Sequence, residues 1–331
     1  MTTSQFLSQL VKDTNKYSLT ESDNKTIQRE GIKKFIFYRL NSTKYRAQAT
    51  SEDYLQKVID KISLSVDCRE PLHITLPFGA TKNPYLPTAP GIDWAEVFNI
   101  AYIREYLAPI AAAYEHGVLL DYISVAAFEE RVNNIPQRDI NKYDHQFTQL
   151  INLFQKYLPN NMQLSYSRVS DKIPQKELIR RINIIVTRLR KSWNNQPKEV
   201  RDRKLFRAQR NCLYDPKAKN IETILLKSAL GHDAFCSESW TTKAAPWDEK
   251  DMIALGHSYT TGWAIHVRSS RGSSVNYWSG IGILAKRAGE YIPTVYSPRQ
   301  LETIKHRLKQ ETAGIFTKSI SKLSQIPILY E

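Results

Sequence analysis

The spacing of apolar residues predicts that the N-terminal part of the chain is helical. Phe6, Leu7 and Leu10 recur at the three- and four-residue spacing of an amphipathic helix, and later segments, including the one that starts at Ser51, repeat this spacing. We therefore expect residues 1–70 to form a helical N-terminal layer.

The pattern changes at Leu72, where short β-rich runs begin to alternate with helix-like segments. The predicted strands are Leu72–Leu76, Val118–Ser124 and Met162–Val169. The predicted helices are Asp93–Tyr114, a short one around Ala126–Asn133, Asp139–Tyr157 and Pro174–Trp193. This alternation is typical of crossover units on a largely parallel sheet. The sequence thus predicts an α/β protein with a Rossmann-like mixed sheet in residues 71–331.

The last third of the chain is denser in strand signals. The predicted strands there are Met252–Ser258, Trp263–Ser269 and Val275–Ala285, and the connection at 269–274 has the composition of a hairpin turn. We therefore expect an antiparallel C-terminal addition to the sheet.

Three further segments complete the predicted organisation. Residues 197–215 are charged, poor in aliphatic side chains and without a clean period, and we interpret them as a basic linker or lid. Ser297–Thr312 has the pattern of a helix, and the tail beyond Ile320 is predicted to be irregular.

The composition is that of a globular protein with an excess of positive charge. Of its 331 residues 41% are hydrophobic and 24% charged, which argues against wholesale disorder. Lys and Arg number 47 against 33 Asp and Glu, giving a formal charge of +14. Such a surplus favours an anionic partner, namely nucleic acid, a phosphorylated metabolite or an acidic membrane surface.

Cysteine usage and the apolar runs bear on the compartment. Cys68, Cys212 and Cys236 lie far apart and form no CxxC pair, which argues against a disulfide framework and for a reducing environment. The N-terminus has no positive region followed by an apolar one, and no apolar run approaches the length of a membrane span. We therefore expect a cytoplasmic protein with no membrane association.

The first candidate site follows the first predicted strand. The segment HITLPFGATKNP, residues 73–84, passes from an apolar run into a loop that carries Lys82 and Asn83. In an open α/β sheet ligands bind at the carboxyl ends of the strands, so this loop could present a cation and an amide to a substrate. The alternative is a solvated connector with a surface lysine. Asp121 lies within the second predicted strand and Ser124 at its end, and either could serve a site or the fold.

The second candidate group comes from the C-terminal third. His257 lies at the end of a predicted strand, where a histidine is suited to proton transfer near neutral pH. Arg268 can grip a phosphate or carboxylate with two parallel hydrogen bonds, and Ser270 belongs to a serine-rich turn that could donate to an anion. A satisfied core histidine and a plain polar hairpin are the alternatives.

A basic stretch supports a different interpretation. Between Lys172 and Arg210 the chain holds 13 Lys or Arg against three acids, with Trp193 and Phe206 interleaved. Such a run could follow a phosphate backbone, although charge runs are commonly solvated helix faces. The residues that would contact nucleic acid in this alternative are Arg201, Arg203, Lys204, Arg207 and Arg210.

Several common motifs are missing from the sequence. There is no GxGxxG after the first strand, no GxxxxGK[ST], no HExxH, no paired Cys-His spacing and no GxSxG. The sequence therefore predicts no cofactor and gives no basis for a metal site.

In the order of its features the chain resembles the isocyanide synthases, the family that includes pyoverdine and dityrosine biosynthesis proteins. The parallels are LPFGATKNP at 76–84, IAAAYEHGVLLDYIS at 110–124, IALGHSY at 253–259 and NYWSGIGIL at 276–284. The chain departs from the family where Val125 and Ala126 follow Ser124, in place of Asp and Gly, and where Ser279 follows Trp278, in place of His.

The resemblance implies a Rossmann-like fold and a small-molecule biosynthetic enzyme that acts on an amino acid amine with a phosphorylated pentulose. Together with the candidates above, it leads us to predict three catalytic residues, His257, Lys82 and Asp121. The predicted substrate-binding residues are Asn83, Ser124, Arg268, Ser270 and Trp278.

Overall fold

The computed structural model of the protein describes most of the chain. It covers residues 1–12, 17–46, 50, 52–79, 81–241, 251–255, 268, 270, 271, 273, 275–316 and 320–331. For residues 52–54, 127, 128 and 236–241 it describes only the backbone.

Eight strands in the described part of the chain form two four-stranded sheets. The first sheet is entirely parallel, has the order β3-β2-β1-β4 and consists of β1 (Leu72–Phe78), β2 (Val118–Ser124), β3 (Met162–Arg168) and β4 (Met252–Ala254). The second is mixed, has the order β6-β5-β8-β7 and consists of β5 (Ile281–Arg287), β6 (Glu290–Tyr296), β7 (Leu308–Thr312) and β8 (Gln325–Tyr330). This arrangement confirms the predicted α/β class.

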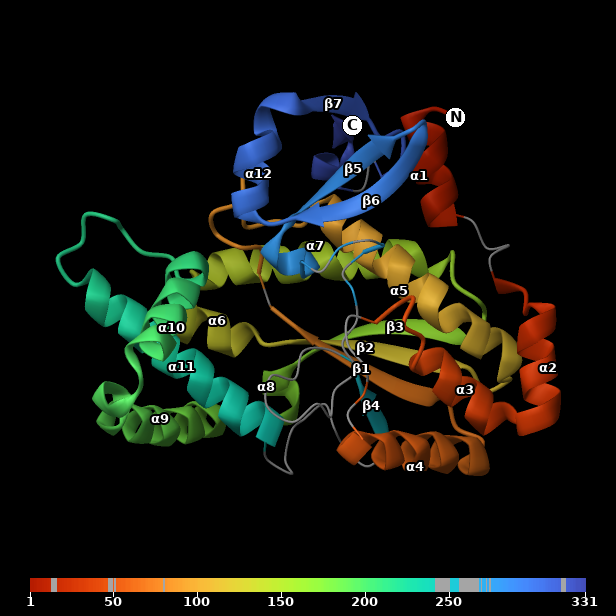
Figure 1. Ribbon diagram of the computed structural model, residues 1–331, viewed down its shortest axis with the longest axis horizontal. Coiled ribbons are helices and arrows are strands. Elements are labelled where there is room, and N and C mark those ends of the chain that lie inside the picture. The colour runs from red at the N-terminus through yellow and green to blue at the C-terminus, as the bar shows by residue number, and fades with distance from the viewer. Residues whose placement is uncertain are drawn as a thin grey trace.

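The helices surround the parallel sheet and fill the space between the two sheets. Helices α5 and α7 lie between the sheets, α4 covers the opposite face of the parallel sheet, and α6, α9, α10 and α11 gather beyond one end of its strands (Figure 1). The α-helices are α1 (Thr3–Lys12), α2 (Glu21–Glu30), α3 (Ile32–Leu40), α4 (Glu52–Cys68), α5 (Trp94–Ala113), α6 (Ala126–Asn133), α7 (Gln137–Gln155), α8 (Val169–Lys172), α9 (Gln175–Lys191), α10 (Lys198–Asn211), α11 (Ile221–Thr241) and α12 (Pro298–Ile304).

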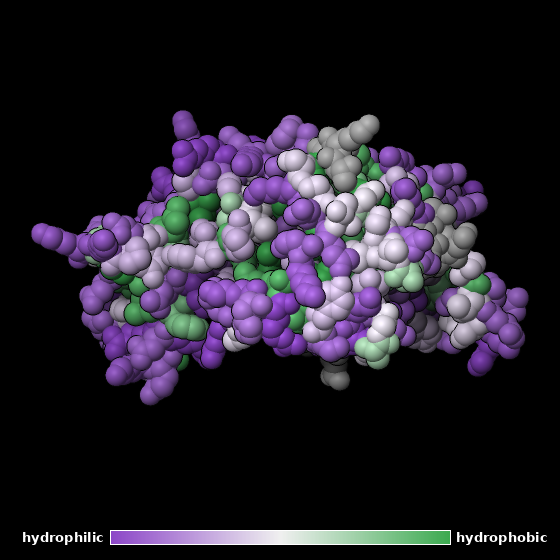
Figure 2. Space-filling model, turned by 90° about the horizontal axis from the view of Figure 1, so that it is seen from above, coloured by the Kyte–Doolittle hydropathy of each residue, from purple (hydrophilic) through white to green (hydrophobic). Residues whose placement is uncertain are grey.

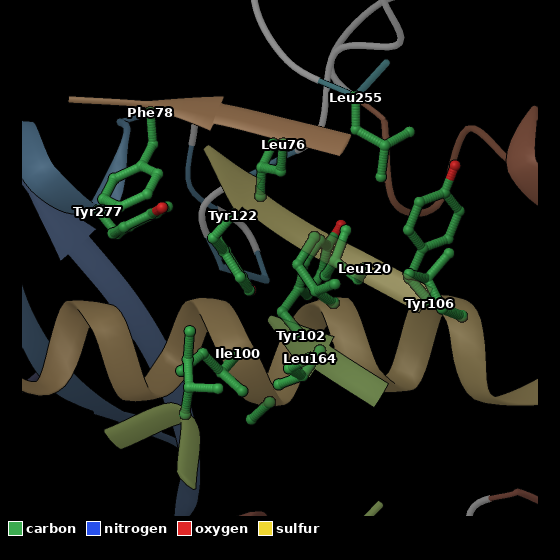
Figure 3. Packing of buried hydrophobic residues seen from close by; sticks show 14 of the residues in the cluster. Leu76, Phe78, Ile100, Tyr102, Tyr106, Leu120, Tyr122, Leu164, Leu255 and Tyr277 are labelled. Atoms are coloured by element: carbon green, nitrogen blue, oxygen red, sulfur yellow. The ribbon is translucent and has the colours of Figure 1, made fainter. Parts of the chain in front are cut away.

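The main core lies between the parallel sheet and α5. Strand alternation places Leu76 of β1 and Leu120 and Tyr122 of β2 on one face, and Figure 3 shows these side chains directed toward α5. Each of the three is buried in one continuous cluster together with Ile100 of α5. The apolar runs of β1 and β2 are long because parallel strands are covered on both faces.

Helix α5 is buried over nearly its whole length, because it is apolar on all sides and packs between two sheets. It begins with a capping box: the side chain of Asp93 accepts from the backbone N–H of Ala95, and that of Glu96 accepts from the backbone N–H of Asp93. Asp93 also accepts a hydrogen bond from the backbone N–H of Gly282 in β5. The start of α5 is therefore fixed to the second sheet.

The C-terminal addition differs in detail from the prediction. Ser297–Thr312 is not one helix, because α12 ends at Ile304 and β7 begins at Leu308 after one 3₁₀ turn. The tail beyond Ile320 is not irregular, because β8 pairs with both β5 and β7. The addition forms a second sheet with one parallel pair, rather than an extension of the first.

The predicted basic linker at 197–215 contains helix α10, which packs against α11. The helical N-terminal layer is present as α1 to α4. The division of the chain into two domains stays a prediction. The expected strand Trp263–Ser269 lies outside the described residues, apart from Arg268.

The surface seen from above is largely hydrophilic, with hydrophobic side chains visible only in small separate areas (Figure 2). Within the described segments, no helix combines the length and the apolar character needed to cross a bilayer.

Candidate functional site

A cavity of about 380 Å³ opens at the carboxyl ends of β1 and β2. Phe78 and Gly79 at the end of β1 and Val125 after β2 line it, and helices α6, α10 and α11 close it from the sides. The chain runs from β1 outward to β3 and then returns to the other side of β1 with β4. Ligands of open α/β sheets bind outside the carboxyl ends of the strands, at such a change of direction.

Helix α6, which starts directly after β2, supplies an acid to the cavity. Glu129 and Asn133 are four residues apart and so share one helix face, and the Asn133 amide donates a 2.7 Å hydrogen bond to the Glu129 carboxylate. Both residues line the cavity. Burial raises the pKa of Glu129 to about 7, and the Asn133 hydrogen bond only partly opposes this rise. A carboxyl group with this pKa can both take and give a proton near neutral pH.

Helix α11 contributes a neutral imidazole. His232 and Phe235, three residues apart, both line the cavity. Burial and the nearby Arg207 charge lower the pKa of His232 to about 4. The ring is therefore uncharged at pH 7.

Helix α10 supplies two guanidinium groups that differ in their pairing. Arg207 lies 2.7 Å from Asp233, a carboxylate that Lys204 also contacts at 2.6 Å. Among the described residues Arg210 makes no ion pair, and its guanidinium lies 5.8 Å from the centre of the Phe206 ring. Arg210 is thus the cation of this wall whose charge no described acidic residue compensates.

The loop after β1 forms another wall through backbone and amide contacts. Asn83 joins three segments: its backbone N–H donates to Trp278 O at 2.9 Å, and its side-chain amide donates to Arg210 O at 3.1 Å. A Cβ at Gly79 would lie 2.5 Å from the Trp278 indole, so only glycine lets this ring approach the strand end. Asn83 and Trp278 both line the cavity, next to Arg210.

Lys82 lies in the protein interior and does not line the cavity. Its ammonium group is fully enclosed and donates at 2.8 Å to both Glu96 oxygens and to Tyr277 O, and it lies 3.1 Å from Asp93. Burial raises the pKa of Glu96 to about 7, with Lys82 acting in the opposite direction. All three donors of Lys82 are used within the fold, so it is neither the surface lysine of a solvated connector nor free to hold an anion.

Asp121 and Ser124 also lie outside the cavity. The Asp121 carboxylate accepts hydrogen bonds from Ser165 at 2.9 Å and Ser167 at 2.8 Å, on the sheet face opposite to Tyr122. Ser124 is completely buried at the end of β2. These two positions therefore belong to the sheet rather than to the wall of the cavity.

Arg268 and Ser270, two of the C-terminal candidates, do not line this cavity. The backbone N–H of Arg268 donates to Tyr45 O at 3.1 Å, and Arg268 opposes the rise that burial causes in the pKa of Tyr102 on α5. Ser270 is buried and forms an isolated antiparallel bridge with Ser273. His257 lies outside the described residues.

The residues of the nucleic-acid alternative are spread over several environments. Arg207 and Arg210 line the cavity, Lys204 is paired with Asp233, Arg201 is half-buried and Arg203 is exposed. Nucleic-acid binding through these residues stays a prediction.

Glu129, Asn133 and His232 are among the polar residues of the cavity that were not singled out from the sequence. Two signals pointed to them. Glu129 lies five residues after the end of the second predicted strand, close to where site residues concentrate. His232 and Asp233 interrupt the otherwise apolar run SALGHDAF, which is unusual for a packed helix.

Comparisons with known proteins were informative at the level of structure. No family model matches the chain, and no curated protein matches its sequence. The crystal structure of the PvcA protein from Pseudomonas aeruginosa matches with a TM-score of 0.63, over 90% of this chain and 99% of PvcA, at 12% sequence identity. At this level of identity the likeness concerns the fold, and it agrees with the fold that the family resemblance implied. The chain therefore has the same overall fold as PvcA.

Proposed function

We propose that the protein is a small-molecule biosynthetic enzyme of the isocyanide-synthase type, acting on the amine of an amino acid with a phosphorylated sugar as co-substrate. The sequence resemblance and the fold shared with PvcA, an isocyanide-synthase-like protein, support the reaction class. The observation that carries the proposal is the joint presence, in one cavity, of an acid with a pKa of about 7 and an uncompensated guanidinium group.

Arg210 is proposed to bind the phosphate of the co-substrate. A guanidinium group matches the oxygens of a phosphate with two parallel hydrogen bonds. The Arg207 charge is already shared with Asp233, so Arg207 would orient the phosphate while Arg210 supplies the net charge. The overall charge of +14 adds a general attraction for such anions.

Glu129 is proposed to move the protons of the condensation. An amino acid amine attacks a carbonyl only after its ammonium has lost a proton, and the carbonyl oxygen leaves as water only after gaining protons. A carboxyl group with a pKa near 7 performs both transfers at neutral pH. The aromatic side chains of Phe78, Phe235 and Trp278 would cover the apolar part of the amino acid and exclude water.

These roles replace the catalytic assignments made from the sequence for Lys82 and Asp121. Lys82 is proposed instead as a positioning residue, because it joins the loop after β1 to the start of α5 and to Tyr277, next to Trp278. Asn83 has a similar role at the end of α10.

The test is a turnover assay with paired variants. Purified protein is incubated with single amino acids and pentulose phosphates, and the products are identified by mass spectrometry. We expect the amino acid to be consumed only when the sugar phosphate is present. Glu129→Gln should lower kcat by about 10²–10⁴-fold, while Glu130→Gln, the exposed neighbour, should leave it unchanged.

The anion site has its own matched pair. Arg210→Gln should raise the KM for the sugar phosphate by about tenfold or more, since a hydrogen bond to a charged group contributes ~1.5–3 kcal/mol. Arg203→Gln removes an exposed arginine of the same helix and should have no effect. Equal effects of the two substitutions, or full activity of Glu129→Gln, would refute the assignment of this cavity as the active site.

A further inference from the structure

A second cavity, of about 260 Å³, lies between α1, α5 and β6. Figure 1 shows these three elements side by side, away from the helices α6, α10 and α11 that surround the first cavity. No described residue lines both cavities.

The walls of the second cavity are mainly apolar. The ring centres of Phe6 and Tyr291 lie 5.1 Å apart on its border. The apolar residues that line it are Phe6, Leu10, Phe98, Ala101, Ile292 and Pro293. Phe98 and Ala101 are almost completely buried, so these walls are anchored in the core of the protein.

Two opposite charges, Arg271 and Glu290, line the same cavity. Arg271 and Glu290 are both exposed, and among the described residues neither takes part in an ion pair or side-chain hydrogen bond. A third charged residue, Glu105, is already engaged by Lys44 at 2.8 Å and by the Tyr45 hydroxyl at 3.0 Å. Within the described part of the chain, the cavity thus offers a ligand one cation and one anion that are not paired with each other or with another side chain.

We propose that this second cavity binds a free α-amino acid with an apolar or aromatic side chain. Its carboxylate would pair with Arg271, its ammonium group with Glu290, and its side chain would enter the apolar space beside Phe98 and Ala101.

The charge pattern separates this ligand from others of similar size. A neutral apolar molecule would pair with neither charge. A simple anion bound to Arg271 would place its negative group near the negative Glu290, and a simple cation bound to Glu290 would place its positive group near the positive Arg271. The volume is slightly below the roughly 300–1,000 Å³ of typical ligand pockets, which suits a single amino acid. The proposal does not depend on the function assigned to the first cavity.

The test is calorimetric titration of the full-length protein with L-phenylalanine. Because the first cavity is also proposed to take an amino acid, the titrations are made in an Arg210→Gln, Glu129→Gln background as well as in the unaltered protein. We expect Arg271→Gln and Glu290→Gln each to weaken binding at the second cavity by tenfold or more. Arg299→Gln, which removes an exposed arginine of α12, should leave it unchanged.

Ligands that lack one charged group identify the partner of each side chain. Phenethylamine has no carboxylate, so it should bind the unaltered protein at least tenfold more weakly than phenylalanine, and Arg271→Gln should weaken it no further. 3-Phenylpropionate has no ammonium group, so it should also bind the unaltered protein at least tenfold more weakly than phenylalanine, and Glu290→Gln should weaken its binding no further.

Three outcomes would overturn the proposal. The first is phenylalanine binding that persists in Arg271→Gln and Glu290→Gln but disappears in the first-cavity variants, which would leave the proposed function intact. The second is equal affinity for phenylalanine and toluene. The third is no binding in the first-cavity background, for any apolar amino acid.

Discussion

At the scale of single residues, the Lys82 network shows how burial decides the role of a charged group. Lys82, Asp93 and Glu96 lie together in the interior, and Tyr143 donates a further 2.9 Å hydrogen bond to Glu96. Burying charges is tolerated only where each is paired and hydrogen-bonded. A strand-end lysine that looked from the sequence like a substrate ligand is therefore a link between structural segments.

Lys82→Met tests this role. It would leave two buried carboxylates without their cation, and we expect a loss of ~3–5 kcal/mol in the free energy of unfolding, measured in urea. Lys142→Met, at an exposed position of α7, is the matched control and should change stability little. In Lys82→Met/Glu96→Gln part of the loss should be recovered. A Lys82→Met protein with normal stability but no activity would restore the catalytic interpretation.

The Glu129 carboxyl predicts a pH dependence of stability. Its pKa is about 7 in the folded protein, against an ordinary value of 4.5, so between these pH values the folded state holds a proton that the unfolded state has lost. Because the folded state binds more protons, this group makes stability fall as the pH rises from 4.5 to 7.

The measurement is the free energy of unfolding of the protein and of Glu129→Gln across that pH range. The difference between the two should change by up to ~3 kcal/mol, since each pKa unit corresponds to about 1.4 kcal/mol. Glu130→Gln should follow the unaltered protein. Parallel curves for the protein and Glu129→Gln would show that the Glu129 pKa is ordinary.

At the scale of elements, the sequence predicted those parts whose hydrophobic period is clear. β1, β2, β3, α5 and α7 follow their expected ranges closely because each presents a continuous or periodic apolar pattern. β7 was read as helix because its sequence, LKQET, has a single apolar residue, and its strand state comes from pairing with β8. β8 in turn pairs with β5, about forty residues earlier in the chain, and such distant pairing leaves no local signal.

The cavity was only partly predictable for the same reason. The rule that ligands bind at strand ends correctly predicted that the loop after β1 would form part of the cavity wall. Asn83 and Trp278, which line the cavity, were among the expected residues. Glu129 and His232 line the same cavity because α6 packs against α11, and the sequence does not encode that packing in any short-range pattern. Arg210 was found, but as a residue of the nucleic-acid alternative.

The contact between α6 and α11 can be tested at Gly231. A Cβ there would lie 2.7 Å from Val132 Cγ2, so Gly231→Ala would push the two helices apart. Overpacking costs about 1–3 kcal/mol, while alanine gains up to ~1 kcal/mol in helix propensity, so a net loss of up to ~2 kcal/mol is expected, together with weaker ligand binding in the first cavity. Val132→Ala provides the space, and the double variant should recover ligand affinity. Additive effects in this cycle would show that the contact does not set the cavity.

At the scale of the whole molecule, the charge of +14 and the position of the basic side chains have separate consequences. The net charge acts on any polyanion, whereas Arg207 and Arg210 of α10 are the described basic residues that line the first cavity. Two contacts join the segments around the first cavity to the C-terminal part of the chain. The backbone N–H of Gly282 in β5 donates to Asp93 at the start of α5, and Lys82 in the loop after β1 donates to Tyr277 O.

This separation gives a prediction for nucleic acid. We expect a short DNA duplex to bind weakly and without sequence preference at low salt, with an affinity that falls steeply as salt rises, because counterion release drives such binding. Arg203→Gln removes one of many surface cations and should reduce the slope of log affinity against log salt concentration by at most about 1. Arg210→Gln should reduce this slope by no more than Arg203→Gln does. Affinity is measured by fluorescence anisotropy at several salt concentrations. A different result would instead make nucleic acid the physiological partner. In that case DNA binding would be saturable and would survive moderate salt. Charge reversal at Arg201 and Arg203 would abolish it without affecting the binding of a sugar phosphate in the first cavity.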